Sequence, residues 1–137
     1  MRQIKEIIIH CSATPEERDW TIKDIERDHK AKGYKKVGYH YVICLDGTVQ
    51  TGREEKEIGA HCKGHNAHSI GICYIGGLDK KMRAKDTRTE EQKTALVKLV
   101  RSLKTRYSGV VVRGHNAYAN KDCPCFDVEK WIKEEGL

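Results

Sequence analysis

The sequence predicts an α/β fold in which a central mixed β-sheet is flanked by helices. Short apolar runs alternate along the chain with amphipathic helical patterns, which is the order of elements in a layered α/β domain. Several of these runs are continuously apolar and rich in isoleucine or valine, as in strands buried on both faces. With 137 residues and 38% hydrophobic residues, the chain can bury a core of ordinary size. We therefore expect a single domain over residues 1–137.

The N-terminal third is expected to hold one strand and one helix. Residues 4–9 end in three consecutive isoleucines, which favours a buried strand. The segment Thr-Pro-Glu-Glu at residues 14–17 favours a turn. A helix is expected from Ile22 to about Lys32, because Thr21 and Asp24 have the spacing of a capping box.

A hairpin and another strand are expected in the middle of the chain. Residues 39–45 and 48–51 favour strands, and the dipeptide Asp46-Gly47 between them is typical of a two-residue hairpin turn. Residues 59–69 have the composition of a loop and carry three histidines and one cysteine. The apolar run 70–75 then predicts a buried strand.

The last third is expected to hold two helices with a strand between them. Thr89 and Gln92 form a second capping box, which begins a helix that runs to about Tyr107. A β-branched strand follows at residues 109–112, and Asp127 can cap a final helix. The apolar face of the longer helix carries Leu96, Leu99, Val100 and Leu103.

The net charge and the composition limit the classes of partner that we expect. A net charge of +6 favours anionic partners such as nucleic acid, a membrane surface or an anionic cell wall, although a basic solvated surface has the same charge. No nucleic-acid motif accompanies the charge, so specific nucleic-acid binding is not expected. No apolar run approaches the roughly 18 residues of a membrane span. Charges interrupt residues 1–6, so we expect no secretory signal and synthesis in the cytoplasm. A monomer is the default expectation.

The six cysteines do not suggest a disulfide framework. With no secretory signal expected, the wide scatter of Cys11, Cys44, Cys62 and Cys73 favours reduced thiols that are buried as small apolar side chains. The remaining two thiols lie two residues apart, too close in sequence to bridge comfortably.

A zinc site is the leading candidate for chemistry. His10 and His115 each follow a predicted strand, and the turn-rich segment after His115 carries Cys123 and Cys125. Zinc accepts nitrogen and sulfur ligands tetrahedrally, and a catalytic site keeps the fourth position open for water. We therefore expect a zinc site made by both histidines and one of the two thiolates, which suits hydrolysis. A hydrogen-bonded structural histidine is the simpler interpretation of His10.

Two other arrangements remain open from the residues alone. The segment His61, Cys62, His65 and His68 is close enough in sequence to chelate a metal, although it has one thiol and no CxxC pattern, so a cleft-lining loop is the simpler interpretation. Nucleophilic catalysis by a cysteine with His115 is the second alternative.

Two further side chains would gain a role beside a metal. Lys121 can stabilise the oxyanion that forms when water attacks an amide. Tyr39 can orient the water or assist proton transfer.

Several motifs occur in a recognisable order along the chain. They are Ile7-Ile-Ile-His-Cys-Ser-Ala-Thr14, Gly38-Tyr-His-Tyr41 before Asp46-Gly-Thr48, Gly59-Ala-His61 before Gly64-His-Asn66 and Ser69-Ile-Gly-Ile72, then Gly114-His115, Lys121-Asp-Cys-Pro124 and Phe126-Asp127. With these motifs, the chain resembles the zinc N-acetylmuramoyl-L-alanine amidases of the phage lysozyme and peptidoglycan recognition protein family. The resemblance extends from about Ile4 to Trp131.

The resemblance implies zinc-dependent hydrolysis of the amide between N-acetylmuramic acid and L-alanine in peptidoglycan, in a zinc cleft at one edge of the sheet. The enzyme would then be bacteriolytic and act on the cell wall, which it would reach by a route other than a signal peptide. Some relatives bind peptidoglycan without cutting it and typically lack the cysteine ligand, so a non-hydrolytic binding or regulatory module is the alternative. The resemblance also assigns site residues: His10, His115 and Cys123 as zinc ligands, Tyr39 and Lys121 as catalytic partners, and His61 and Asn66 in the substrate groove.

Overall fold

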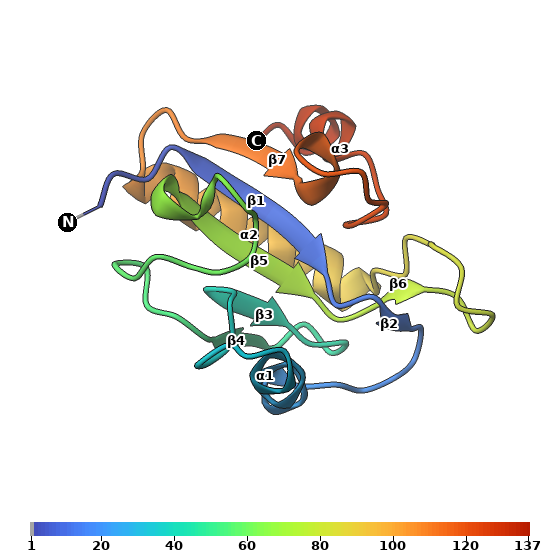
Figure 1. Cartoon of the computed structure of the whole chain (residues 1–137). Coiled ribbons are helices and arrows are strands. Elements are labelled where there is room, and N and C mark those ends of the chain that lie inside the picture. Colours follow the sequence, from blue (N-terminus) through green and yellow to red (C-terminus); the bar gives the residue numbers. More distant parts are fainter. Residues whose placement is uncertain (1) are drawn as a thin grey trace.

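A five-stranded mixed sheet forms the centre of the computed structural model, which describes residues 2–137. The strand order is β4-β3-β5-β1-β7. Strand β1 (Glu6–Cys11) lies between β5 (Ser69–Tyr74) and β7 (Val111–Gly114) and is parallel to both (Figure 1). Strand β3 (Tyr41–Ile43) is parallel to β5, and β4 (Val49–Thr51) is antiparallel to β3. The predicted mixed sheet is therefore confirmed.

A second, two-stranded sheet replaces part of a predicted turn. The turn expected at residues 14–17 is wrong for its first half, because β2 (Thr14–Pro15) pairs in parallel with β6 (Gly77–Leu78). The pairing bonds are donated by the backbone N–H groups of residues 14 and 16, to the carbonyls of Gly76 and Leu78. The N–H that Pro15 lacks is therefore not needed, which is how proline is accommodated at a sheet edge.

The hairpin between β3 and β4 has a longer turn than predicted. Its loop holds three residues, Leu45, Asp46 and Gly47, because the N–H of Cys44 donates to the carbonyl of Thr48 at 2.9 Å. A two-residue type I′ turn needs positive φ at both central residues. Here Gly47 has a φ of +87°, whereas Asp46 is not among the residues with positive φ. The two-residue turn is therefore wrong, and glycine takes the left-handed position that ends a three-residue loop.

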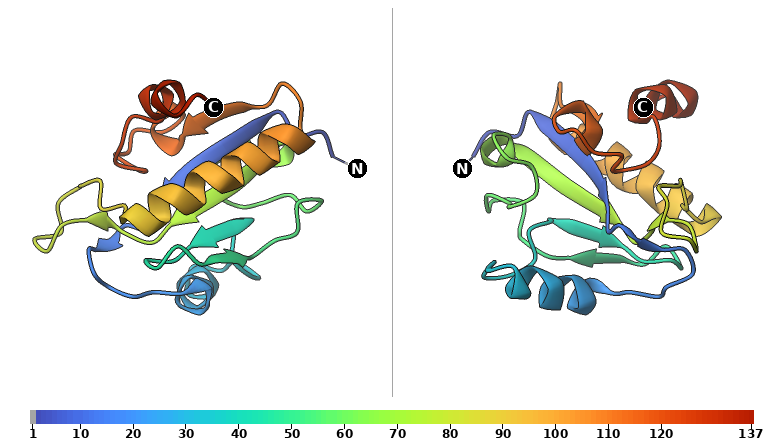
Figure 2. Two further views of the ribbon diagram at one scale, coloured as in Figure 1. Left: turned by 180° about the vertical axis from the view of Figure 1, so that it is seen from behind. Right: turned by 45° about the vertical axis from the view of Figure 1, so that its right-hand side comes forward.

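The three helices begin where the sequence predicts. Helix α1 (Ile22–Ala31) and helix α2 (Glu90–Arg106) each start with the expected capping box, and the side chain of Asp127 caps α3 (Val128–Glu135). Helix α2 crosses one face of the sheet. Helix α1 lies away from α2, near β3 and β4 (Figure 2). No helix within residues 2–137 is long and apolar enough to cross a membrane.

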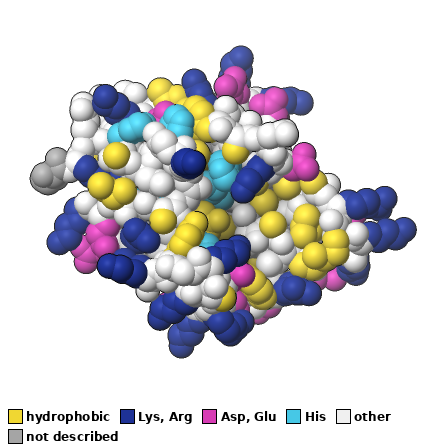
Figure 3. Space-filling model, viewed as in Figure 1, with side chains coloured by type: hydrophobic (Ala, Val, Ile, Leu, Met, Phe, Trp, Pro, Cys, Tyr) yellow, Lys and Arg dark blue, Asp and Glu magenta, His cyan; other side chains and the backbone are white. Residues whose placement is uncertain are grey.

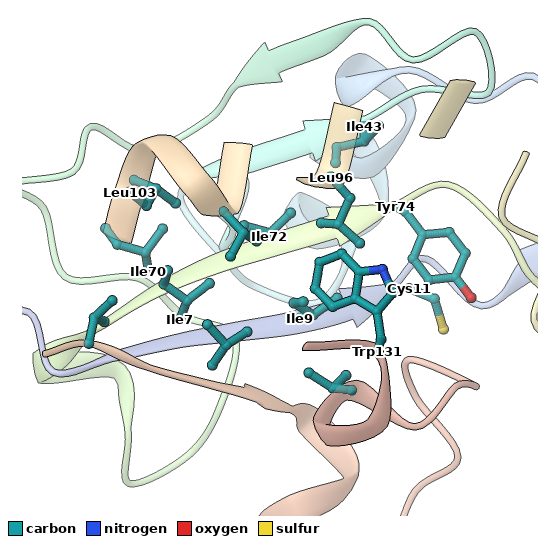
Figure 4. Close-up of a cluster of buried hydrophobic side chains, with 14 residues drawn as sticks. Ile7, Ile9, Cys11, Ile43, Ile70, Ile72, Tyr74, Leu96, Leu103 and Trp131 are labelled. Carbon is teal, nitrogen blue, oxygen red and sulfur yellow. The ribbon is translucent and has the colours of Figure 1, made fainter. Parts of the chain in front are cut away.

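The pleat of β1 divides its side chains between the core and the site. Ile7, Ile9 and Cys11 belong to the main hydrophobic cluster, where they meet Leu96 of α2 and Trp131 of α3 (Figure 4). Successive side chains of a strand point to opposite faces of the sheet. The side chain of the intervening residue 10 therefore lies on the face away from α2.

Truncation of the core contact on α2 should destabilise the fold. Leu96 is fully buried, so Leu96→Ala should lower the free energy of unfolding by about 2–5 kcal/mol, through lost burial and a residual cavity. Urea denaturation measures the change. Lys98→Ala, at an exposed position of the same helix, is the control and should shift stability by less than about 0.5 kcal/mol. Equal effects of the two substitutions would contradict this description of the core.

Candidate metal centre

Three side chains from distant parts of the chain converge at the ends of β1 and β7. They are His10, His115 and Cys123, whose ligand atoms all lie within 4.8 Å of one another. The parallel register pairs Ile9 with Gly114, so the next residues of both segments emerge side by side. The ring centroids of His10 and His115 are accordingly 4.5 Å apart. These are the two histidines that the sequence indicated, with one of the two thiols.

Buried contacts hold the loop that carries Cys123. The hydroxyl of Tyr74, a core residue of β5, donates to the carbonyl of Pro124 at 2.6 Å. The backbone N–H of Cys11 donates to Cys123 Sγ at 3.2 Å. Cys123 Sγ lies 4.0 Å from His10 Nδ1. Tetrahedral zinc would place such a nitrogen and sulfur roughly 3.6 Å apart, so the donor set fits zinc with a small adjustment.

Cys125 is directed away from this cluster. Its backbone is left-handed, with a φ of +69°, and its thiol donates to the carbonyl of Gly77 at 3.3 Å. Its Sγ lies 3.9 Å from the Sγ of Cys11, on the side of the sheet that holds the core. Of the two thiols left open by the spacing, the one that joins the two histidines is therefore Cys123.

His61 forms a hydrogen bond with His10, a contact that the sequence did not indicate. The two rings share a hydrogen bond of 2.8 Å between His10 Nε2 and His61 Nδ1, and His61 Nε2 lies 3.1 Å from Ser69 Oγ. A Cβ atom at Gly71 would come within 2.7 Å of the His61 ring, so only glycine leaves room for it there. With Nε2 engaged, Nδ1 is the nitrogen of His10 that faces the thiol of Cys123.

A cleft of about 460 Å³ opens beside the cluster. His61 and Asn66, the expected groove residues, both line it, together with His115, Tyr118 and Lys121. The side-chain oxygen of Asn66 accepts hydrogen bonds from the backbone N–H groups of His61 and Cys62, each at 2.9 Å, so it also shapes the loop. Figure 3 shows histidine side chains reaching the surface near the middle of this face, between lysine or arginine side chains.

The two expected catalytic partners have different surroundings. The Tyr39 ring is half-buried and its centroid is 5.1 Å from that of His10. It also packs at 5.3 Å against His29, whose Nδ1 accepts a hydrogen bond from the backbone of Gly38. Lys121 is exposed and lines the cleft, so its ammonium group can reach a molecule bound there.

Burial sets the protonation states at the cluster. It lowers the pKa of His10 well below the ordinary value and lowers the pKa of His61 to about 3. Burial also lowers the pKa of His115, with a smaller contribution from the charge of Lys121. All three imidazoles are therefore neutral near pH 7, which is the form that binds metal ions. Burial raises the pKa of Tyr39 well above its ordinary value, so its hydroxyl keeps its proton.

The alternative metal cluster predicted from the sequence does not form with the four predicted residues. His61 bonds to His10, and Cys62 is buried, so neither joins His65 and His68. These last two face Glu6 instead, at the start of β1. Local spacing could not indicate this, because the pairing of Glu6 with Ser69 in the sheet brings the segments together.

The reduced state expected for the thiols is confirmed, since all six cysteines are free and the four scattered ones are buried.

Comparisons with known proteins agree on one family. A profile of the N-acetylmuramoyl-L-alanine amidase family matches residues 1–126. The endolysin of Klebsiella phage KP32 is 39% identical over 99% of this chain and 90% of its own length, and that of Escherichia phage T7 is 40% identical over 96% and 87%. Among solved structures, the N-acetylmuramoyl-L-alanine amidase LysC from Clostridium intestinale URNW has a TM-score of 0.84 at 27% identity, covering 99% of this chain and 87% of that one. Drosophila PGRP-LB has a TM-score of 0.77 at 25% identity, covering 90% and 76%.

The buried state of His61 should make the metal-free protein sensitive to acid. In the unfolded chain His61 takes up its proton near pH 6.5, whereas in the folded chain it does so near pH 3. Between these values the unfolded state binds more protons, so the free energy of unfolding falls as the pH falls. His61→Gln removes this titration, and its stability should therefore decline less steeply. Urea denaturation of both proteins at about pH 7.5 and about pH 5 measures the difference, and equal declines would contradict the assignment.

Proposed function

The chain belongs to the N-acetylmuramoyl-L-alanine amidase family, and we propose that His10, His115 and Cys123 bind a catalytic zinc ion. The enzyme hydrolyses the amide between N-acetylmuramic acid and L-alanine in peptidoglycan. The observation that carries the zinc proposal is the convergence of the three ligand atoms beside an open cleft.

The chemistry of the donor set supports zinc. Two neutral imidazoles and one thiolate are ligands that zinc accepts, whereas magnesium and calcium prefer oxygen. The thiolate has a backbone N–H donor from Cys11, and both imidazoles are kept neutral by burial. When bound, zinc supplies a Lewis acid that polarises a carbonyl group and lowers the pKa of water.

The remaining residues would position the reactants. His61 fixes the orientation of His10 through Nε2, as an outer hydrogen-bond partner does for a metal-binding histidine. Tyr39 keeps its proton, so its hydroxyl acts as a hydrogen-bond donor that orients the attacking water. Lys121 carries its positive charge into the cleft and would stabilise the oxyanion formed on the scissile carbonyl. His61 and Asn66 line the cleft on the substrate side.

The place of action that we propose is the cell wall. The matched relatives include endolysins of Klebsiella phage KP32 and Escherichia phage T7, which favours a lytic role for this chain as well. The net charge of +6 suits an anionic wall polymer. A module that only recognises peptidoglycan is the weaker proposal, because the full set of three metal ligands would have no use in it.

The two neighbouring cysteines provide a matched test of the zinc ligands. Cys123→Ser should lose zinc and, with it, the release of L-alanine amino termini from peptidoglycan. Cys125→Ser should retain both, because that thiol faces Gly77 and not the cluster. Zinc content by mass spectrometry and amino-group release are measured on the same samples. Retention of zinc by Cys123→Ser, or its loss from Cys125→Ser alone, would overturn the assignment.

The catalytic partners should affect turnover without affecting zinc. Tyr39→Phe removes one hydroxyl, and Lys121→Ala removes the charge in the cleft. Each should lower kcat by at least about tenfold, since single groups of this kind contribute roughly 10²–10⁴ in rate. Lys130→Ala, at an exposed position on α3, is the control. Full activity in both variants, with zinc bound, would refute the roles given to them.

A further inference from the structure

We propose that Glu6, His65 and His68 form a second divalent-metal site, distinct from the one at His10. Their ligand atoms all lie within 4.8 Å of one another. Glu6 Oε2 is 3.1 Å from His65 Nδ1 and 3.8 Å from His68 Nε2. Two imidazoles and one carboxylate are a ligand set used by zinc and by other transition metals such as cobalt and nickel.

Backbone hydrogen bonds hold these ligands in place without a metal. The N–H of His65 donates to the carbonyl of Cys62 at 3.0 Å, and the carbonyl of His68 accepts from the N–H of Lys5 at 2.8 Å. The guanidinium of Arg2 donates to the carbonyls of Asn66 and Ser69, at 3.2 and 2.8 Å, on either side of His68. Binding a metal here would therefore order little additional chain, which favours affinity.

Tyr118 orients two of the three ligands. Its ring stacks on His65 with centroids 3.8 Å apart and an angle of 19° between the planes. Its hydroxyl donates to Glu6 Oε1 at 2.9 Å, which leaves Oε2 facing the two imidazoles. Outer partners that fix a carboxylate and a ring in this way are typical of metal sites.

The side chains of this second site are partly exposed to solvent, whereas His10 is buried. The side chains of Glu6, His65 and His68 are 16%, 26% and 34% exposed. A metal ion can therefore enter directly, and water can complete its coordination. Histidine side chains also gather at a second place on the surface, toward the upper left of the view in Figure 3.

The two sites share no ligand, and residues next to the second site line the cleft beside the first. Glu6 precedes His10 by four residues of β1, which corresponds to roughly 13 Å along a strand, so no ligand is shared. Tyr118 and Asn66, which contact or flank the second site, also line the cleft. A metal ion there would fasten the wall formed by the loop of residues 59–69 to strand β1. The role of this ion would be to stabilise that wall, because Glu6 belongs to β1 and both histidines belong to the loop.

Cobalt distinguishes the two sites because only the first has a thiolate. Titration of the metal-free full chain with Co²⁺ should show two bound equivalents by equilibrium dialysis. The thiolate-to-cobalt charge-transfer band should saturate with one of them. His68→Ala should lower the affinity for the cobalt ion that produces no band at least tenfold. It should leave the band itself unchanged. Glu6→Gln, which preserves the partner of the Tyr118 hydroxyl, should do the same.

The reciprocal variant separates this proposal from that of the catalytic zinc. Cys123→Ser should lose the band yet still bind one cobalt ion. A single bound equivalent that produces the band in the unsubstituted chain would overturn the second site. So would a second equivalent that persists at full affinity in both folded variants, His68→Ala and Glu6→Gln, with folding checked by circular dichroism.

Discussion

The parallel pairing of β1 with β7 is the contact on which the site depends. Its register places Ile9 opposite Gly114, so His10 near the end of β1 lies beside His115, the residue that follows β7. The pleat of β1 simultaneously directs Ile7 and Ile9 into the core. A slip of one residue would exchange the two faces and bury the wrong side chains, so the hydrophobic core enforces the position of the metal ligands.

The third ligand depends on the core in a different way. Cys123 lies in a loop, but the loop is bound to β5 by the hydroxyl of Tyr74 and to β1 by the N–H of Cys11. On the opposite side, His61 and Ser69 extend a chain of polar contacts from the His10 ring back to β5. The centre therefore rests on buried contacts between rigid strands, which is the condition for a preorganised metal site.

Short-range sequence signals predicted the helices and strands. Strand pairing determined the type of hairpin turn and the contacts within the site. The capping boxes at Thr21 and Thr89 are complete within four residues, so the sequence alone located both helix starts. The Asp46-Gly47 dipeptide is compatible with more than one turn, and the choice depends on the register of β3 and β4. In the site, the motifs indicated His10, His115 and Cys123. The contacts of His61 with His10 and of Glu6 with His65 arise between segments more than 50 residues apart, which no local spacing encodes.

The most direct test of the zinc amidase is the release of new L-alanine amino termini from purified peptidoglycan, measured with a chelator and after zinc is added back. The chelator should abolish release and zinc should restore it, because the donor set of His10, His115 and Cys123 matches that ion. Release that continues after the metal is removed would contradict it. So would a zinc-loaded protein that binds the wall tightly and frees no amino termini.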